Sequence, residues 1–358
     1  MLTVLLSTRN RARLLQDVLE SFCQLEPPPG GWKLVVVDNG STDQTPQVIA
    51  SFSSRLPLHS FAEPRLGKNF ALNSGLRFIE GDLTVLTDDD VFPHPEWLVE
   101  LRRSADTLPA YSMFGGAILP RWEAPPKPWL EWVDQRVVYS LTDPSLQEGQ
   151  ILPYLIFGPN MVLRAAIFRS GISFDSSIGP CGATYPMGSE TELLMRLGRE
   201  GHNAWHVPGA VVEHFIRKEQ LDKAWALRRA ISFGRGQYRL LAGEPATYAK
   251  LWMGTPRHLV RAVLGQAARV TAAGLSFRPE AVFRSRWRFN VLRGQVIEAR
   301  ILARERYAQA QSARANGSPD AHKASSAEAS SRRATADGSV FVCESGSGTL
   351  WDHPPDST

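Results

Sequence analysis

The chain has 358 residues, of which 43% are hydrophobic and 21% charged, so it is long enough for one large domain or two ordinary ones. These proportions exclude a wholly disordered, collagen-like or multi-span membrane chain. The net charge of +4 is too small to indicate a nucleic-acid partner. Three widely spaced cysteines, Cys23, Cys181 and Cys343, favour a reducing, cytoplasmic compartment over a disulfide framework. No secretory signal and no membrane-spanning run are expected.

Short apolar runs alternate with segments of helical period in the first hundred residues, the pattern of βα units on a mostly parallel sheet. Strands are predicted at residues 2–6, 33–37, 56–61 and 83–87, and helices at residues 14–22, 43–52 and 68–79. Ligands of open α/β sheets bind beyond the carboxyl ends of the strands. Thr8, Asp38 and Asp88 follow three of these strands, so we expect them at one edge of the sheet.

The rest of the chain changes character three times. Residues 120–153 are rich in Trp and Pro without a steady period, and we interpret them as a long excursion over the site. A mixed segment follows, with a predicted helix at residues 190–200 and a strand at residues 210–212. Residues 215–307 are predicted to be helical, and residues 308–358, poor in large apolar side chains, to be disordered.

Charge divides along the same boundaries. Residues 1–214 hold 17 basic and 24 acidic side chains, residues 215–307 hold 19 and 6, and the remainder holds 4 and 6. The small net charge therefore averages an acidic part with a strongly basic one.

The run Asp88, Asp89 and Asp90 places carboxylates at a strand end, where their crowding costs energy unless a cation is bound. Two or three carboxylate oxygens, with the other positions left to water and phosphate, suit Mg²⁺ or Mn²⁺. The structural alternative is a solvated acidic turn ahead of a helix that starts near Pro95.

Two further loops carry polar side chains. Asp38 follows the second strand and could accept a hydrogen bond from the ring N–H of a base, or could simply belong to a βα turn. Gly67 and Lys68 open a helix, where backbone N–H groups and an ammonium could face a diphosphate; the alternative is an ordinary helix start with a solvated Lys68. No GxGxxG or P-loop motif is present.

Taken together and in order, these motifs resemble those of the inverting family 2 glycosyltransferases of the GT-A fold. The set is Thr8-x-Asn10-Arg11, Asp38-Asn39-Gly40-Ser41-Thr42-Asp43, Gly67-Lys68 with Asn73-Ser74-Gly75, Asp88-Asp89-Asp90, and Glu190-Thr191-Glu192-Leu193. The resemblance covers about residues 1–240 and implies an α/β, Rossmann-like nucleotide-diphospho-sugar transferase with a mostly parallel central sheet.

The resemblance also implies a nucleotide-sugar donor, most often a UDP-sugar, and a Mg²⁺ or Mn²⁺ ion on a DxD motif. The base would lie near Thr8 and Asp38. The implied donor-binding residues are Thr8, Arg9, Asn10, Asp38, Lys68, Asn69, Asp88 and Asp89, and the implied metal ligands are Asp88, Asp90 and His214. His202 and His206 have no comparable support.

The catalytic base of the family is usually the Asp of a Glu-Asp pair, and here Ser189 and Glu190 stand at those positions. Glu190 keeps a carboxylate one methylene longer, so we expect it to be the base; a role at the helix start, and Glu192 as the base, are the alternatives. The expected acceptor-binding residues are Trp122, Gly158, Asn160 and Glu192.

The predicted organisation is a catalytic domain at residues 1–240, a basic helical appendage at residues 241–307 and a tail at residues 308–358. We expect an inverting hexosyltransferase that acts on a lipid-linked or polysaccharide precursor, with the appendage on an anionic membrane surface, the inner face of the cytoplasmic membrane, or packed on the catalytic domain. No nucleic-acid module is recognised. A sugar-phosphate nucleotidyltransferase and a catalytically silent nucleotide-sugar-binding scaffold are the alternatives.

Overall fold

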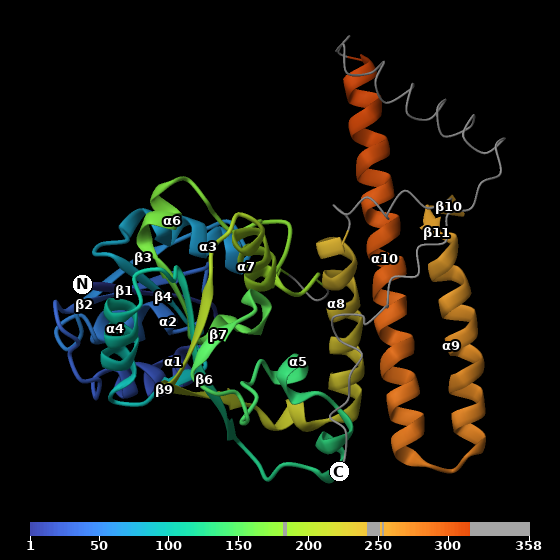
Figure 1. Ribbon diagram of the computed structural model, residues 1–358, viewed down its shortest axis with the longest axis horizontal. Helices are drawn as coiled ribbons and strands as arrows, with labels where there is room; N and C mark the ends of the chain where they lie inside the picture. The colour runs from blue at the N-terminus through green and yellow to red at the C-terminus, as the bar shows by residue number, and fades with distance from the viewer. Residues whose placement is uncertain (182–184, 242–250, 253, 316–358) are drawn as a thin grey trace.

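The computed structural model describes residues 1–181, 185–241, 251–252 and 254–315. Figure 1 shows a central sheet with helices on both faces and, beside it, the three long helices α8, α10 and α9. The strands are β1 Leu2–Thr8, β2 Trp32–Asp38, β3 Leu58–Ala62, β4 Leu83–Leu86, β5 Val91–Pro93, β6 Met113–Trp122, β7 Gly149–Ile151, β8 Met161–Arg164, β9 Ala204–Ile216, β10 Leu251–Trp252 and β11 Thr255–Pro256.

The α-helices are α1 Ala12–Phe22, α2 Thr45–Ser51, α3 Lys68–Gly75, α4 Trp97–Thr107, α5 Gln135–Tyr139, α6 Ala165–Arg169, α7 Ser189–Arg199, α8 Lys223–Leu241, α9 Arg257–Leu275 and α10 Pro279–Ala315. Short 3₁₀ helices are η1 Leu76–Phe78, η2 Pro128–Trp132, η3 Pro153–Leu155, η4 Gly158–Asn160 and η5 Lys218–Leu221. No helix in these described parts is long and apolar enough to cross a membrane.

The main sheet has the strand order β3-β2-β1-β4-β8-β6-β9-β5, with β7 paired to β9. Strands β3, β2, β1 and β4 are parallel, while β8 runs antiparallel to both of its neighbours. This is the predicted α/β architecture, and the strands expected at residues 2–6, 33–37, 56–61, 83–87 and 210–212 are confirmed.

Two hydrophobic cores cover the two faces of the sheet. Successive residues of a strand point to opposite faces, so Val4 of β1 packs in the core under α1 and α4, while Leu5 packs in the core under α3 and α7. Both positions are fully buried. Burial of both faces explains why the first two strands are continuous apolar runs.

Three predicted boundaries shift for local reasons. The helix expected at residues 43–52 begins at Thr45, because the Asp43 carboxylate lies ahead of it and accepts the Thr45 N–H at 3.0 Å. The helix expected at residues 68–79 is α3 followed by η1. The predicted disorder from residue 308 is wrong for residues 308–315, which continue α10; elongating an existing helix costs little where Ala, Gln and Arg dominate. Residues 316–358 lie outside the described residues.

The expected irregular excursion at residues 120–153 has more structure than predicted. It contains the end of β6, η2, α5 and β7. Its indoles serve as anchors: Trp129 is 5% exposed, and its ring centroid lies 5.3 Å from that of Phe283 in α10. These aromatic side chains bury more apolar area by packing together than they would in a solvated loop, which explains the ordered path.

Helices α8 and α10 form a close interface. A Cβ at Gly234 would lie 1.9 Å from the Val291 carbonyl oxygen, so only glycine permits this approach. Beside it, the fully buried Glu298 accepts hydrogen bonds from Arg235 and Arg239 of α8. A largely buried ion cluster therefore joins the end of the predicted catalytic part to the predicted appendage.

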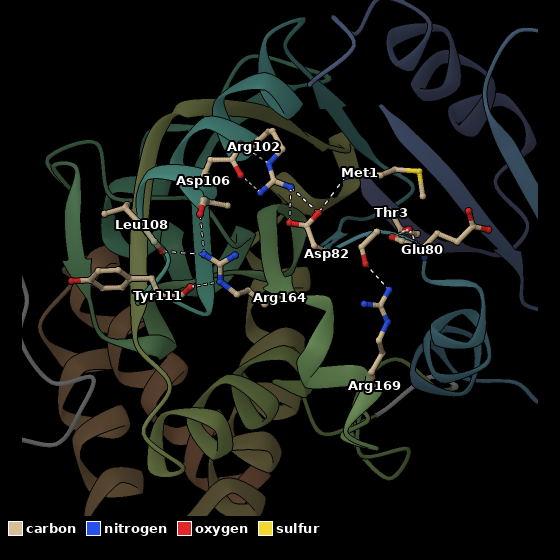
Figure 2. Close-up of polar contacts among 12 residues, drawn as sticks. Met1, Thr3, Glu80, Asp82, Arg102, Asp106, Leu108, Tyr111, Arg164 and Arg169 are labelled. Carbon is tan, nitrogen blue, oxygen red and sulfur yellow. Dashed lines mark hydrogen bonds and ion pairs between the residues drawn. The ribbon is translucent and has the colours of Figure 1, made fainter. Parts of the chain in front are cut away.

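Hydrogen bonds from two arginines link the segments that precede β4 and β6, at the end of the sheet where the parallel strands begin, as Figure 2 shows. Nη1 of Arg102 donates to both oxygens of Asp82 at 2.8 Å. Arg164 donates from Nε to the Tyr111 carbonyl at 2.8 Å and from Nη2 to the Leu108 carbonyl at 3.1 Å. Bonds from ionised donors are stronger than neutral ones, so this network stabilises the edge opposite the predicted site.

Candidate active site

The carboxyl ends of three parallel strands meet as the sequence predicted. Thr8 is in register with Asp38 at the ends of β1 and β2, and β4 lies on the other side of β1. The three aspartates follow β4 directly, and Thr8 Oγ1 donates to Asp89 Oδ2 at 2.7 Å. The sheet therefore brings Thr8, Asp38 and the aspartate run to one edge.

The pKa values of the half-buried Asp89 and the buried Asp90 are shifted in opposite directions. Burial, followed by the adjacent Asp90 charge, raises the pKa of Asp89 to about 6. Burial would also raise the pKa of Asp90, but His214 and Arg11 lie against it and hold this pKa below its ordinary value. Asp90 is therefore ionised, next to a carboxyl group that is harder to ionise.

His214 has the orientation of a metal-binding or proton-sharing imidazole. Its Nδ1 lies 2.7 Å from the Tyr139 carbonyl oxygen, which can only accept, so Nδ1 carries the hydrogen. Nε2 therefore faces Asp90 Oδ1, at 3.4 Å. Burial opposes the imidazolium, but the Asp90 carboxylate outweighs it and raises the pKa of His214. Such a pair can share a proton or hold a divalent cation between its atoms.

The predicted metal ligands come together only in part. Asp90 and His214 are in contact, whereas Asp88 pairs with Lys68. Across the described residues, no three carboxylate, imidazole or thiol groups form a ready-made metal cluster. Asp90 and His214 fit a divalent ion that takes most of its ligands from phosphate and water.

Lys68 connects the aspartate run to the predicted base. From the first turn of α3 its Nζ donates to Asp88 Oδ1 and, at 2.7 Å, to Glu190 Oε1. Burial disfavours the ammonium, but the two carboxylates prevail and raise the pKa of Lys68. Lys68 is therefore charged, and it separates two carboxylates that would otherwise repel each other.

Glu190 is held in one position by three features. Besides Lys68, Ser189 Oγ donates to Glu190 Oε2 at 2.7 Å. A Cβ at Gly158 would lie 2.8 Å from Glu190 Cδ, so the absence of a side chain there admits the carboxylate. Burial would raise the pKa of Glu190, yet Lys68 lowers it below the ordinary value. The result is an ionised, oriented carboxylate at the start of α7.

Two arginines at this site were missed as candidates in the sequence. Nη1 of Arg11 lies 3.5 Å from Asp90 Oδ2, and Nη1 of Arg217 lies 3.8 Å from the same oxygen. Arg11 belongs to the first motif and could have been selected from it. Arg217 follows the end of β9, and no sequence spacing connects it to Asp90.

Two asparagines expected to bind ligands make buried hydrogen bonds within the protein. The Asn69 amide donates to the carbonyls of Asp175 and Ile178, and the side chain is 2% exposed. Asn160 is fully buried, where it accepts from Trp97 Nε1 at 2.9 Å and donates to the Ala210 carbonyl at 2.8 Å. Buried amides need such partners, and Asn69 Oδ1 has none among the described residues. The donor role of Asn69 and the acceptor role of Asn160 stay predictions.

The remaining candidates lie around the rim. Asp38 Oδ1 accepts the Ser41 N–H at 3.0 Å, and Asn10 Oδ1 accepts the Thr42 N–H at 2.8 Å, so both shape the loop after β2. Arg9 is exposed.

The other two acceptor candidates contact neighbouring side chains. Glu192 pairs with Arg196 one helical turn away. Trp122 packs edge-on against Tyr139, with ring centroids 5.6 Å apart. Acceptor binding by Trp122 and Glu192 stays a prediction.

Solved structures share this fold at low sequence identity. The mannosyltransferase PcManGT from Pyrobaculum calidifontis, in complex with GDP-Man and Mn²⁺, aligns with a TM-score of 0.57 at 19% identity, over 83% of this chain and 86% of its own. S. aureus TarS residues 1–349 in complex with UDP aligns with a TM-score of 0.50 at 16% identity, over 84% and 91%. The shared architecture is the GT-A fold.

Sequence comparisons agree. Residues 3–169, slightly less than half of the chain, match the model described as Glycosyl transferase family 2, so this segment is that of a family 2 glycosyltransferase. The glucosyl-dolichyl phosphate glucuronosyltransferase of Haloferax volcanii is 23% identical over 57% of this chain and 65% of its own length. The validoxylamine A glucosyltransferase of Streptomyces hygroscopicus subsp. limoneus is 30% identical over 32% and 26%, and the beta-monoglucosyldiacylglycerol synthase of Nostoc sp. is 27% identical over 25% and 20%. These matches span between a fifth and two thirds of the relatives' lengths.

Proposed function

We propose that this chain is an inverting glycosyltransferase that moves a sugar from a nucleotide-sugar donor, with UDP-sugars as the first choice, to a hydroxyl of a lipid-linked or polysaccharide-precursor acceptor. The single observation that carries the proposal is the ionised Glu190, oriented by Lys68 and Ser189 beside the aspartates that follow β4. A relative is named for a dolichyl phosphate substrate, which supports a lipid-linked acceptor. A cytoplasmic location is part of the same proposal.

In the proposed reaction Glu190 takes the proton of the acceptor hydroxyl. The acceptor oxygen attacks the anomeric carbon as the bond from that carbon to the nucleotide phosphate oxygen breaks, and the electron pair leaves with the nucleoside diphosphate. One displacement from the opposite face inverts the anomeric configuration. Arg11 and Arg217, whose guanidinium groups lie near Asp90, would bind diphosphate oxygens. A Mg²⁺ or Mn²⁺ ion held by Asp90 and His214 would neutralise charge on the leaving group.

The neighbouring acid on α7 provides a matched test of the base. Glu190→Gln removes the proton acceptor but keeps the shape of the side chain, so we expect donor binding to persist and transfer to be lost. Glu192→Gln changes an acid two positions away that pairs with Arg196, and we expect transfer to be retained. Full transfer by Glu190→Gln, or loss only with Glu192→Gln, would contradict the assignment of the base.

The donor is best found with a panel of nucleotide sugars in the presence of Mg²⁺ or Mn²⁺. Release of nucleoside diphosphate by slow donor hydrolysis identifies the sugar even without the acceptor. Activity with a nucleoside triphosphate and a sugar phosphate, together with none on the panel, would instead indicate a nucleotidyltransferase. Donor binding without hydrolysis or transfer to any acceptor would favour a silent scaffold.

A further inference from the structure

The turn between α9 and α10 exposes large apolar side chains. Leu275, at the end of α9, is 75% exposed, and Phe277, within the turn, is 93% exposed. Phe277 also has a φ of 54°, a left-handed conformation that bulky residues rarely adopt. In Figure 1, α9 is the helix farthest from the central sheet, and α10 lies between α9 and α8. Nothing among the described residues covers these two side chains.

The hairpin around this turn is strongly basic. Residues 257–293 contain eight arginines and a single acid, Glu280. Glu280 is itself paired with Arg284 at 2.8 Å, which leaves seven positive charges without an acidic partner in the segment. Arg278 follows Phe277 directly and is exposed. Apolar exposure and positive charge therefore coincide at the turn.

A groove of about 360 Å³ begins beside Phe277 and has a mixed lining. Phe283 and Leu227 contribute apolar surface, while Lys223 and Arg286 contribute cations. Lys223, whose Nζ lies 4.3 Å from the Trp132 ring centroid, and Leu227 bring the start of α8 into the lining of this groove. An apolar floor with cations at its edge suits a molecule that carries both an acyl chain and a phosphate.

We propose that this hairpin tip, formed by Leu275, Phe277 and the groove beside them, docks on an anionic phospholipid bilayer. The bilayer interface accepts the exposed aromatic and aliphatic side chains, and the anionic headgroups attract the arginines. A second copy of the chain fits less well, because two identical basic surfaces would face each other, and two exposed side chains fall far short of a stable dimer interface. The proposal does not depend on the transfer activity.

Vesicle flotation of the full chain tests the proposal. We expect binding to phosphatidylcholine vesicles that contain phosphatidylglycerol, and much weaker binding to phosphatidylcholine alone. The double substitution Leu275→Ser with Phe277→Ser should weaken binding more than about tenfold, because both apolar groups are lost. Arg278→Glu with Arg286→Glu should weaken it by at least about fivefold for each charge, as expected for basic residues near a charged membrane.

A matched control distinguishes binding through the hairpin tip from non-specific hydrophobic binding to vesicles. Leu152 is 55% exposed on the catalytic part, and Leu152→Ser should leave flotation unchanged. Unaltered thermal unfolding and donor hydrolysis would show that each variant is folded. The proposal is overturned if the chain does not float with anionic vesicles, or if the tip variants float as well as the parent. It is also overturned if light scattering shows that the parent chain is a dimer, that the Leu275→Ser/Phe277→Ser variant is a monomer, and that the parent does not bind anionic vesicles.

Discussion

Replacing Gly158 by alanine should move the Glu190 carboxylate without unfolding the chain. The new Cβ would lie 2.8 Å from both Cδ and Oε1 of Glu190 and 2.9 Å from Cγ. Ordinary contact begins at 3.4 Å, so the carboxylate must retreat by about 0.6 Å. Its hydrogen bonds to Lys68 and Ser189, both 2.7 Å, would lengthen or break.

A displacement of 1 Å in a reacting group can cost about 10²-fold in rate, so we expect kcat to fall by about tenfold to a hundredfold. The donor KM should change little, because the aspartates after β4 keep their partners. The assay is steady-state release of nucleoside diphosphate with the acceptor saturating. Combined with Glu190→Gln, the Gly158→Ala change should have no further effect, since both act through one carboxylate.

Gly265 provides the control for a glycine-to-alanine change. It lies within α9, and a Cβ there would meet nothing within 4 Å. Gly265→Ala should leave kcat unchanged and raise the free energy of unfolding by about 0.5–1 kcal/mol, because alanine favours helix. A Gly158→Ala variant with the kcat of the parent would refute the reasoning that this glycine positions the base.

Three further changes test the site and the fold. Lys68→Met removes the ammonium that lowers the pKa of Glu190, so burial raises that pKa and the acidic limb of kcat against pH should move to higher pH; an unmoved limb contradicts this assignment. Arg164→Met loses its hydrogen bonds to backbone carbonyls and should lower the free energy of unfolding, measured by chemical denaturation, by about 2–3 kcal/mol. Arg103, whose side chain is 63% exposed and pairs with Glu100, is the control: Arg103→Met should change the free energy of unfolding by less than about 0.5 kcal/mol. Asp90→Asn should abolish the dependence of donor affinity on Mg²⁺ or Mn²⁺ in calorimetry, and an unchanged dependence would remove Asp90 from the metal site.

The fold was predictable from the sequence where hydrophobic residues recur with the period of a strand or a helix. The apolar runs of the first strands and the helical spacing after them placed β1, α1 and β2 within one or two residues, because burial of both sheet faces leaves few polar positions in such strands. The segment at residues 120–153 had no period to interpret. Its order comes from the packing of Trp129 against Phe283, more than a hundred residues away, which no local pattern reports.

The sequence predicted which residues lie at the strand ends of the candidate site, but not which contacts their side chains make. Thr8, Asp38 and the aspartates converge because parallel strands share an edge, and Glu190 was identified by its resemblance to a family motif. Asn69 and Asn160 occupy motif positions too, but their amides serve buried backbone carbonyls. A motif gives the residue type at a position, whereas the direction of its side chain depends on which neighbours are left without partners.

By itself, the sequence determined that an acidic, sheet-based part precedes a basic, helical part, and which strand ends carry carboxylates. Only the tertiary structure decided that Asp90 is surrounded by Arg11, His214 and Arg217, and that Lys68 lies between Asp88 and Glu190. The physical reason is the sequence distance over which each property is set. The ends of the strands follow from the local hydrophobic period, whereas the charge balance of a buried site depends on atoms that are a few ångströms apart in space but come from distant parts of the chain.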